Sequence, residues 1–128
     1  MRLLLDTHIL LWSAGQPEKL SDSARILLTT PENGLFFSAA SIWEMVIKLG
    51  LGREDFKVDP PRLRKMLAVS GYAELPVTAE HALRVDTLPP LHKDPFDRLL
   101  IAQARAEGLV LLTGDAAVAQ YQESVLLV

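Results

Sequence analysis

The sequence contains no cysteine in its 128 residues. Disulfide bonds, thiolate zinc sites and cysteine nucleophiles are therefore excluded. No stretch approaches the roughly 20 consecutive apolar residues that a membrane-spanning helix needs. The apolar run at residues 3–5 ends at Asp6, and it is too short for the core of a signal peptide. We therefore expect a soluble protein of the cytoplasm with no membrane contact.

The sequence also lacks the strong positive charge typical of many nucleic-acid-binding proteins, because its formal net charge is −3. The charges are unevenly distributed. Residues 41–71 carry six basic and four acidic side chains, which leaves +2 there and −5 on the remainder. A basic segment beside an acidic remainder suits a phosphate backbone that approaches a carboxylate site. A pair of solvated helices is the simpler interpretation.

Apolar residues make up 49% of the chain, which is enough to bury a core in a single domain that spans residues 1–128. Five short apolar segments predict strands, at residues 2–5, 35–37, 72–77, 109–112 and 125–128. These segments are apolar throughout and alternate with helical patterns. This arrangement predicts an α/β fold of three layers, α/β/α, around a mostly parallel sheet. Pro76 favours a sheet edge for the third strand.

The predicted helices begin and end at clear signals. Ser38 is expected to cap a helix over residues 39–49. Asp94 and Pro95 begin the clearest helix of the chain, which continues to about Ala104 and ends at Gly108. These signals place the acidic residues of the next paragraph relative to the strands.

Four carboxylates follow strands or begin helices that lead into them. Asp6 follows the first strand, and Glu44 lies in the helix after the second. Asp97 lies at the start of the helix before the fourth strand, and Asp115 follows that strand. Ligands of open α/β sheets bind at the carboxyl ends of the strands, so we expect these acids at one edge. A cation would relieve their repulsion, and oxygen ligands suit Mg²⁺ or Mn²⁺. Such a centre can hydrolyse a phosphodiester with an activated water.

Helix capping is the alternative role for each aspartate. Asp6 and Asp115 each precede a predicted helix, where a carboxylate accepts hydrogen bonds from free backbone amides. Asp94 and Asp97 have the spacing of a cap and the third residue of a first turn. Asp94 is expected to cap the helix, and its participation in the metal site stays open.

Ordinary surface roles are the alternative for Glu44 and the three histidines. Glu44 lies four residues before Lys48, the spacing of a surface ion pair on a helix. His81 is expected on a helix surface, and His8 and His92 in solvated loops near the candidate site. Their spacing is not that of a zinc site.

Four motifs occur in an order that resembles the PIN-domain proteins, and closely the VapC toxins of type II toxin–antitoxin pairs. They are Leu-Leu-Asp-Thr-His at 4–8, Ser-Ile-Trp-Glu at 41–44, the run of thirteen residues at 92–104, and Leu-Thr-Gly-Asp at 112–115. The resemblance covers essentially the whole chain. Each short motif is weak alone, and the long run at 92–104 makes the set specific.

The resemblance implies a three-layer PIN-like fold and an endoribonuclease that uses Mg²⁺ or Mn²⁺. On the matched positions the catalytic and metal-binding acids are Asp6, Glu44, Asp97 and Asp115. Thr7 or Thr113 would orient these carboxylates through hydrogen bonds. His8 departs from the many relatives that carry Asn at this position, which bears on local hydrogen bonds and not on the metal.

The resemblance also implies an RNA substrate, a homodimer and a small antitoxin that covers a hydrophobic groove. The candidate groove residues are Ile42, Trp43, Val46, Ile47 and Leu49. Burial in the core is the alternative for them, and we expect it for at least half.

Two other functions were weighed. A phosphoacceptor receiver domain has a similar size, but it needs an acidic pair after the first strand and a lysine after a late one. Asp6 has no acidic neighbour, and no lysine follows Lys93. A catalytically silent binding module with the PIN shape is the second alternative, and the presence of all four acids argues against it.

Overall fold

The computed structural model describes residues 1–52 and 58–128, and its centre is a sheet of five parallel strands. The strand order is β3-β2-β1-β4-β5. The strands are β1 (Arg2–Leu5), β2 (Gly34–Ser38), β3 (Ala73–Leu75), β4 (Val110–Thr113) and β5 (Val125–Leu127). The predicted parallel sheet is confirmed, and β3, the strand that precedes Pro76, lies at an edge of the sheet as expected.

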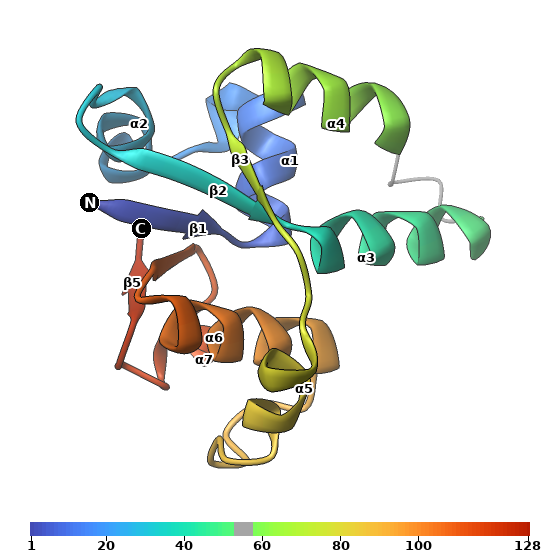
Figure 1. Cartoon of the computed structure of the whole chain (residues 1–128). Coiled ribbons are helices and arrows are strands. Elements are labelled where there is room, and N and C mark those ends of the chain that lie inside the picture. The colour runs from blue at the N-terminus through green and yellow to red at the C-terminus, as the bar shows by residue number, and fades with distance from the viewer. Residues whose placement is uncertain (53–57) are drawn as a thin grey trace.

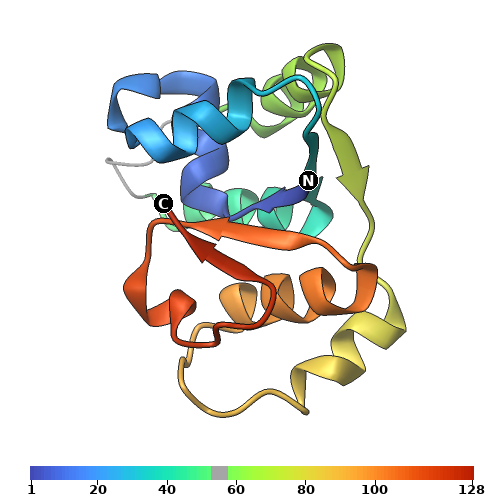
Figure 2. The same cartoon turned by 90° about the vertical axis from the view of Figure 1, so that its left-hand side faces the viewer.

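Helices cover both faces of this sheet (Figures 1 and 2). They are α1 (Thr7–Gly15), a 3-10 turn at Pro17–Lys19, α2 (Asp22–Thr29), α3 (Ala39–Gly50), α4 (Pro60–Val69), α5 (Ala79–Val85), α6 (Pro95–Glu107) and α7 (Ala116–Ala119). Buried side chains of α1 to α4 form one core cluster with the sheet, and those of α6 and α7 form another. The predicted three-layer α/β/α architecture is therefore confirmed.

The central strands are apolar throughout because both of their faces are covered. Leu4 and Leu111 belong to the cluster beneath α6, whereas Leu5 and Phe37 belong to the cluster beneath α1 and α3. All four side chains are at most 1% exposed. Burial of each contributes about 1.5–3 kcal/mol relative to exposure. This packing fixes the sheet that carries the acids at its edge.

The predicted helix caps are present. Ser38 accepts a hydrogen bond from the amide of Ala40. Asp94 accepts from the amides of Phe96 and Asp97. Gly108 ends α6 with φ +66°, a left-handed conformation that glycine adopts without strain.

The expected surface position of His81 is wrong. Its side chain is 1% exposed, since it packs between the start of α5, where it closes a capping box, and α6. Nδ1 accepts from the amide of Thr78, and Nε2 hydrogen-bonds the carboxylate of Glu107. The buried Gln103 lies beside this ring and accepts a hydrogen bond from the hydroxyl of Ser38. This polar chain ties the start of α3 to α6, the two helices that carry Glu44 and Asp97.

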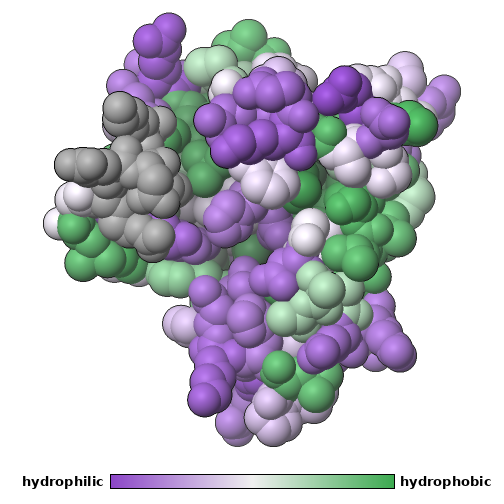
Figure 3. Space-filling view, turned by 180° about the vertical axis from the view of Figure 1, so that it is seen from behind, coloured by the Kyte–Doolittle hydropathy of each residue, from purple (hydrophilic) through white to green (hydrophobic). Residues whose placement is uncertain are grey.

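None of the described helices is long and apolar enough to cross a membrane. On the face seen in Figure 3, apolar side chains form several separate patches between hydrophilic ones. Part of the basic segment of residues 41–71, namely 53–57, lies outside the described residues. The expected basic surface therefore stays a prediction.

Candidate metal centre

Asp6 directly follows β1 and is held by two hydrogen bonds. Its Oδ1 accepts from the amide of Ile9 at 2.8 Å, and its Oδ2 accepts from the hydroxyl of Thr113 at 2.6 Å. The side chain caps α1, as the alternative role predicted. Asp6 is only 5% exposed, so these bonds fix the direction of a buried carboxylate at the sheet edge.

Asp115 is linked to Asp6 through Thr113. The Thr113 hydroxyl donates to Asp6 and accepts from the amide of Asp115 at 3.0 Å. Asp115 also caps α7 through the amide of Ala117. Thr113 ends β4, the strand next to β1, so the parallel pairing brings the two acids to the same edge.

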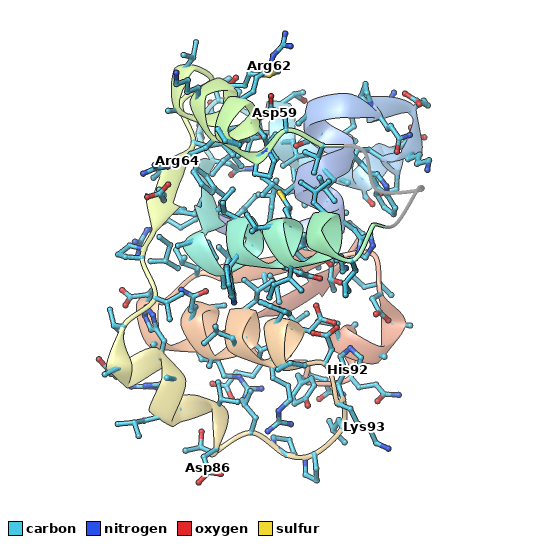
Figure 4. All side chains as sticks on the ribbon, turned by 90° about the vertical axis from the view of Figure 1, so that its right-hand side faces the viewer. Asp59, Arg62, Arg64, Asp86, His92 and Lys93 are labelled. Carbon is cyan, nitrogen blue, oxygen red and sulfur yellow. The ribbon has the colours of Figure 1, made fainter. Side chains whose placement is uncertain are left out.

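Asp97 lies in the first turn of α6 and contacts His92. Its Oδ2 lies 2.8 Å from Nε2 of His92. The backbone amide of His92 donates to the hydroxyl of Tyr121, which fixes the loop before α6. Figure 4 shows His92 beside the start of α6. One ligand atom from each of His92, Asp97 and Asp115 lies within 4.8 Å of the others.

His92 is thus a site residue that sequence reasoning placed in a solvated loop. It lies five residues before Asp97, and the intervening Asp94 and Pro95 turn the chain back over the helix start. Such a turn was the one available signal for this contact. The spacing matches no usual metal-ligand pattern, because the two residues do not share a helix face or a strand.

The acids influence one another electrostatically. Burial raises the pKa of Asp97 to about 6, and the charge of Asp94 adds to the increase. His92 opposes it through its hydrogen bond and charge, and Asp6 contributes a smaller increase. An ionised Asp97 therefore lies in an environment that already carries excess negative charge.

The pKa of Asp6 is raised in the same way. Burial raises its pKa, and the charge of Asp115 raises it further. The hydrogen bonds from Ile9 and Thr113 and the charge of His8 act in the opposite direction. Asp6, Asp97 and Asp115 therefore lie within electrostatic reach of one another, which is the proximity that the sequence predicted for them.

Glu44 is close to this cluster but has other partners. Its Oε1 accepts from the Thr7 hydroxyl at 2.7 Å, and its Oε2 lies 2.7 Å from Nζ of Lys48. The i,i+4 ion pair of the alternative interpretation is present, yet Glu44 itself is only 4% exposed. Thr7 directly follows Asp6, so Glu44 points toward the same sheet edge. A metal-binding role for Glu44 stays a prediction.

The two threonines hold carboxylates as expected from the resemblance. Thr7 bonds Glu44, and Thr113 bonds Asp6. Asp94 instead directs its carboxylate to the backbone amides at the start of α6. Its observed role is the cap, and it affects the cluster through its charge on Asp97.

This donor set fits a divalent cation. The pKa values of Asp6 and Asp97 are raised, and the charge of Asp115 lies beside them, so a cation between the three carboxylates relieves the repulsion. Carboxylate oxygens suit Mg²⁺ and Mn²⁺, and the His92 hydrogen bond can orient the carboxylate of Asp97 toward such an ion.

We expect the cation to stabilise the protein more at pH 7.5 than at pH 5. The folded-state pKa of Asp97 is about 6, above its ordinary 3.8, so without metal the group destabilises the fold as pH rises through this range. The carboxylate keeps partial contact with water, so this effect should be on the order of 1 kcal/mol. Thermal unfolding in EDTA and in Mn²⁺ at both pH values measures it.

Two variants serve as controls for this prediction. Asp97→Asn should reduce the difference between the two pH values, because the titrating group is absent. Asp86→Asn changes an exposed carboxylate at the end of α5 and should retain the wild-type difference. An equal Mn²⁺ stabilisation at both pH values in the wild type would contradict the assignment.

Comparisons with known proteins agree with the motifs. Residues 3–123 match the family model described as PIN domain. No curated protein matches the chain in a sequence search. The structure is similar to that of VapBC2 from Rickettsia felis bound to a DNA fragment from its promoter, with 17% identity and a TM-score of 0.69 over 100% of this chain and 98% of that one.

Two further solved structures have the same fold. VapBC-1 from nontypeable Haemophilus influenzae has 18% identity and a TM-score of 0.64 over 100% of this chain and 97% of that one. A toxin–antitoxin complex from Klebsiella pneumoniae has 21% identity and a TM-score of 0.60 over 97% and 95%. At these identities the likeness shows a common fold.

Proposed function

Because the chain belongs to the PIN-domain family, we propose that it is a Mg²⁺- or Mn²⁺-dependent endoribonuclease and the toxin of a toxin–antitoxin pair. The observation that carries this proposal is the gathering of Asp6, Asp97 and Asp115 at one sheet edge. Burial raises the pKa of both Asp6 and Asp97, so the site holds negative charge at a cost to folding. A binding site for a cation explains that cost.

The side chains have distinct roles in the proposed reaction. Asp6 would bind the cation from a direction fixed by Thr113, and Asp97 from one fixed by His92. Asp115 would bind from the open side, and Glu44 would join through its position beside Thr7. When bound, the cation supplies an activated water and offsets the charge of the reacting phosphate. The reaction then needs no nucleophilic side chain from the protein.

An antitoxin partner is the second part of the proposal. It is supported by the solved structures of similar fold, whose names describe VapBC and toxin–antitoxin complexes. In the expected groove, Trp43 is 59% and Val46 is 45% exposed, so α3 offers apolar surface to a partner. The other three candidates, Ile42, Ile47 and Leu49, are partly buried. The homodimer is carried over from the family resemblance alone.

The two alternatives fit less well. A receiver domain would have the strand order 2-1-3-4-5, whereas this sheet has the order 3-2-1-4-5. A catalytically silent PIN-shaped module would not need Asp6, Asp97 and Asp115 within electrostatic reach of one another, because their mutual repulsion costs folding free energy. The ribonuclease is therefore the function that the geometry supports best.

Cleavage of a labelled single-stranded RNA by the purified protein tests the proposal. We expect cleavage with added Mg²⁺ or Mn²⁺, a loss of about 100-fold or more in excess EDTA, and recovery when Mn²⁺ is restored. Full activity in EDTA would refute the metal-dependent mechanism. Protein with Asp6→Asn, purified in the same way, controls for contaminating nucleases.

A further inference from the structure

A pocket opens directly beside the acidic cluster. It has a volume of about 350 Å³, within the range of about 300–1,000 Å³ that is usual for small-molecule sites. Its lining residues are Asp6, His8, Trp12, Gly114, Asp115 and Ala116. Two of the candidate metal ligands and two aromatic rings therefore share one hollow.

The rings of His8 and Trp12 form one wall of this pocket. They lie one turn apart on α1, with centroids 5.9 Å apart and planes tilted by 49°. Trp12 packs on the core cluster beneath α1, and a Cβ at Gly114 would lie only 3.7 Å from its Cζ3 atom. The backbone between β4 and α7 therefore lies beside the Trp12 ring, which is partly buried, while His8 is exposed at the surface.

The cation centre does not require these rings. Aromatic rings beside candidate metal-binding carboxylates suit a ligand with a flat apolar ring at one end and a phosphate at the other. A nucleotide has this character, because its base stacks on aromatic side chains while its phosphate meets a cation. The chain has a net charge of −3, so contacts with RNA phosphates alone give it little affinity. Stacking of a base supplies affinity that does not depend on net charge.

We propose that the pocket binds an unpaired nucleobase next to the scissile phosphate, stacked on Trp12 and bordered by His8. The inference rests on the proposed ribonuclease function, which identifies the phosphate beside the pocket as that of the cleaved RNA bond. It adds that the substrate is single-stranded at the cleaved bond, because the bases of a duplex already stack on their neighbours. It also assigns a role to His8, whose ring centroid lies 5.9 Å from that of Trp12.

Tryptophan fluorescence tests the stacking without any need for catalysis. The chain has two tryptophans, so Trp43→Phe leaves Trp12 as the only reporter. With Ca²⁺, which also takes oxygen ligands, in place of Mg²⁺ or Mn²⁺, we expect a short unstructured RNA to quench Trp12 in a saturable way and the same RNA in a duplex not to quench it. A set of RNAs, each lacking one base, then locates the stacked base. The RNA that lacks the base next to the cleaved bond should no longer quench Trp12 fluorescence. Equal quenching by all such abasic RNAs, or none by the intact RNA, would overturn the inference.

Kinetic variants give an independent test. Trp12→Leu keeps an apolar side chain in the core but removes the stacking surface, so KM should rise about 5- to 150-fold, the equivalent of about 1–3 kcal/mol. Trp12→Phe should restore most of the affinity. His8→Ala changes an exposed residue and should raise KM by a smaller factor, which keeps the test valid if Trp12→Leu lowers stability. Unchanged KM in both Trp12→Leu and His8→Ala would contradict the inference.

Failure of this inference and failure of the proposed function are distinguishable. Metal-dependent cleavage with no Trp12 quench refutes the stacking site and leaves the ribonuclease intact. A base-dependent quench without cleavage in any metal supports the nucleotide pocket and identifies the chain as a silent RNA-binding module.

Discussion

Asp6→Asn is expected to reduce RNA cleavage by about 10²–10³-fold or more, the size of effect seen when a group that stabilises transition-state charge is removed. The change replaces one oxygen of the buried carboxylate with an amide nitrogen and removes the negative charge. With its amide oxygen toward the Ile9 amide, Asn keeps the α1 cap, and its amide nitrogen can donate to the Thr113 hydroxyl. Measured kcat with Mn²⁺ should fall while the far-ultraviolet circular dichroism stays unchanged.

The same variant should be more stable than the wild type in metal-free buffer. Burial raises the pKa of Asp6, so an ionised carboxylate there costs folding free energy at neutral pH that the amide does not. Asp22→Asn, at the exposed start of α2, is the matched control and should change neither activity nor stability appreciably. An unaffected cleavage rate in Asp6→Asn would reject its assignment as a metal ligand.

Asp97→Asn and Asp94→Asn are expected to differ sharply, although the two residues lie in the same helix turn. Asp97 shares the ligand cluster with His92 and Asp115, so its loss should reduce kcat by about 100-fold or more. Asp94 binds backbone amides, and Asn caps helices as well as Asp does. Asp94→Asn should therefore stay within about threefold of wild-type activity, since a helix cap contributes mainly to stability.

Steady-state cleavage with a titration of Mn²⁺ separates the two cases. Asp97→Asn should need a higher Mn²⁺ concentration for half-maximal activity, whereas Asp94→Asn should keep the wild-type value. Equal losses in both variants would mean that Asp94 belongs to the metal site.

The sequence predicted the fold well because the central strands carry a strong physical signal. Residues 2–5 and 109–112 are apolar at every position, which is stable only when helices cover both faces of a sheet. The predicted boundaries are within one residue for β1, β2, β4 and β5, and the PIN-domain match supports the resemblance inferred from the motifs. The third strand was predicted too long, because Pro76 and its neighbours already belong to the loop toward α5.

The site was predicted in part. Asp6 and Asp115 follow neighbouring parallel strands, so their proximity comes from topology alone. The contact between His92 and Asp97 depends on a loop that Tyr121 holds from a distant part of the chain, so the turn at Asp94 and Pro95 does not predict it alone. The predicted surface position of His81 was wrong for a related reason. Its burial depends on contacts with Gln103 and Glu107, which belong to another helix.

The capping and catalytic interpretations of the aspartates are not exclusive. Asp6 and Asp115 each use one carboxylate oxygen as a helix cap while their charges act on a common site. Capping fixes the side chain at the end of its strand, so the same hydrogen bond that begins a helix also orients a candidate ligand. This is why a residue with an ordinary structural role can be at the centre of the proposed chemistry.

The most direct test of the central claim is to express the wild-type chain and Asp6→Asn in cells and to sequence the RNA ends that appear. The account predicts new ends at a small set of sites with the wild type, located in unpaired segments, and none of these ends with Asp6→Asn at equal protein level. The same new ends with both proteins, or none with the wild type, would contradict an RNA hydrolase that depends on Asp6.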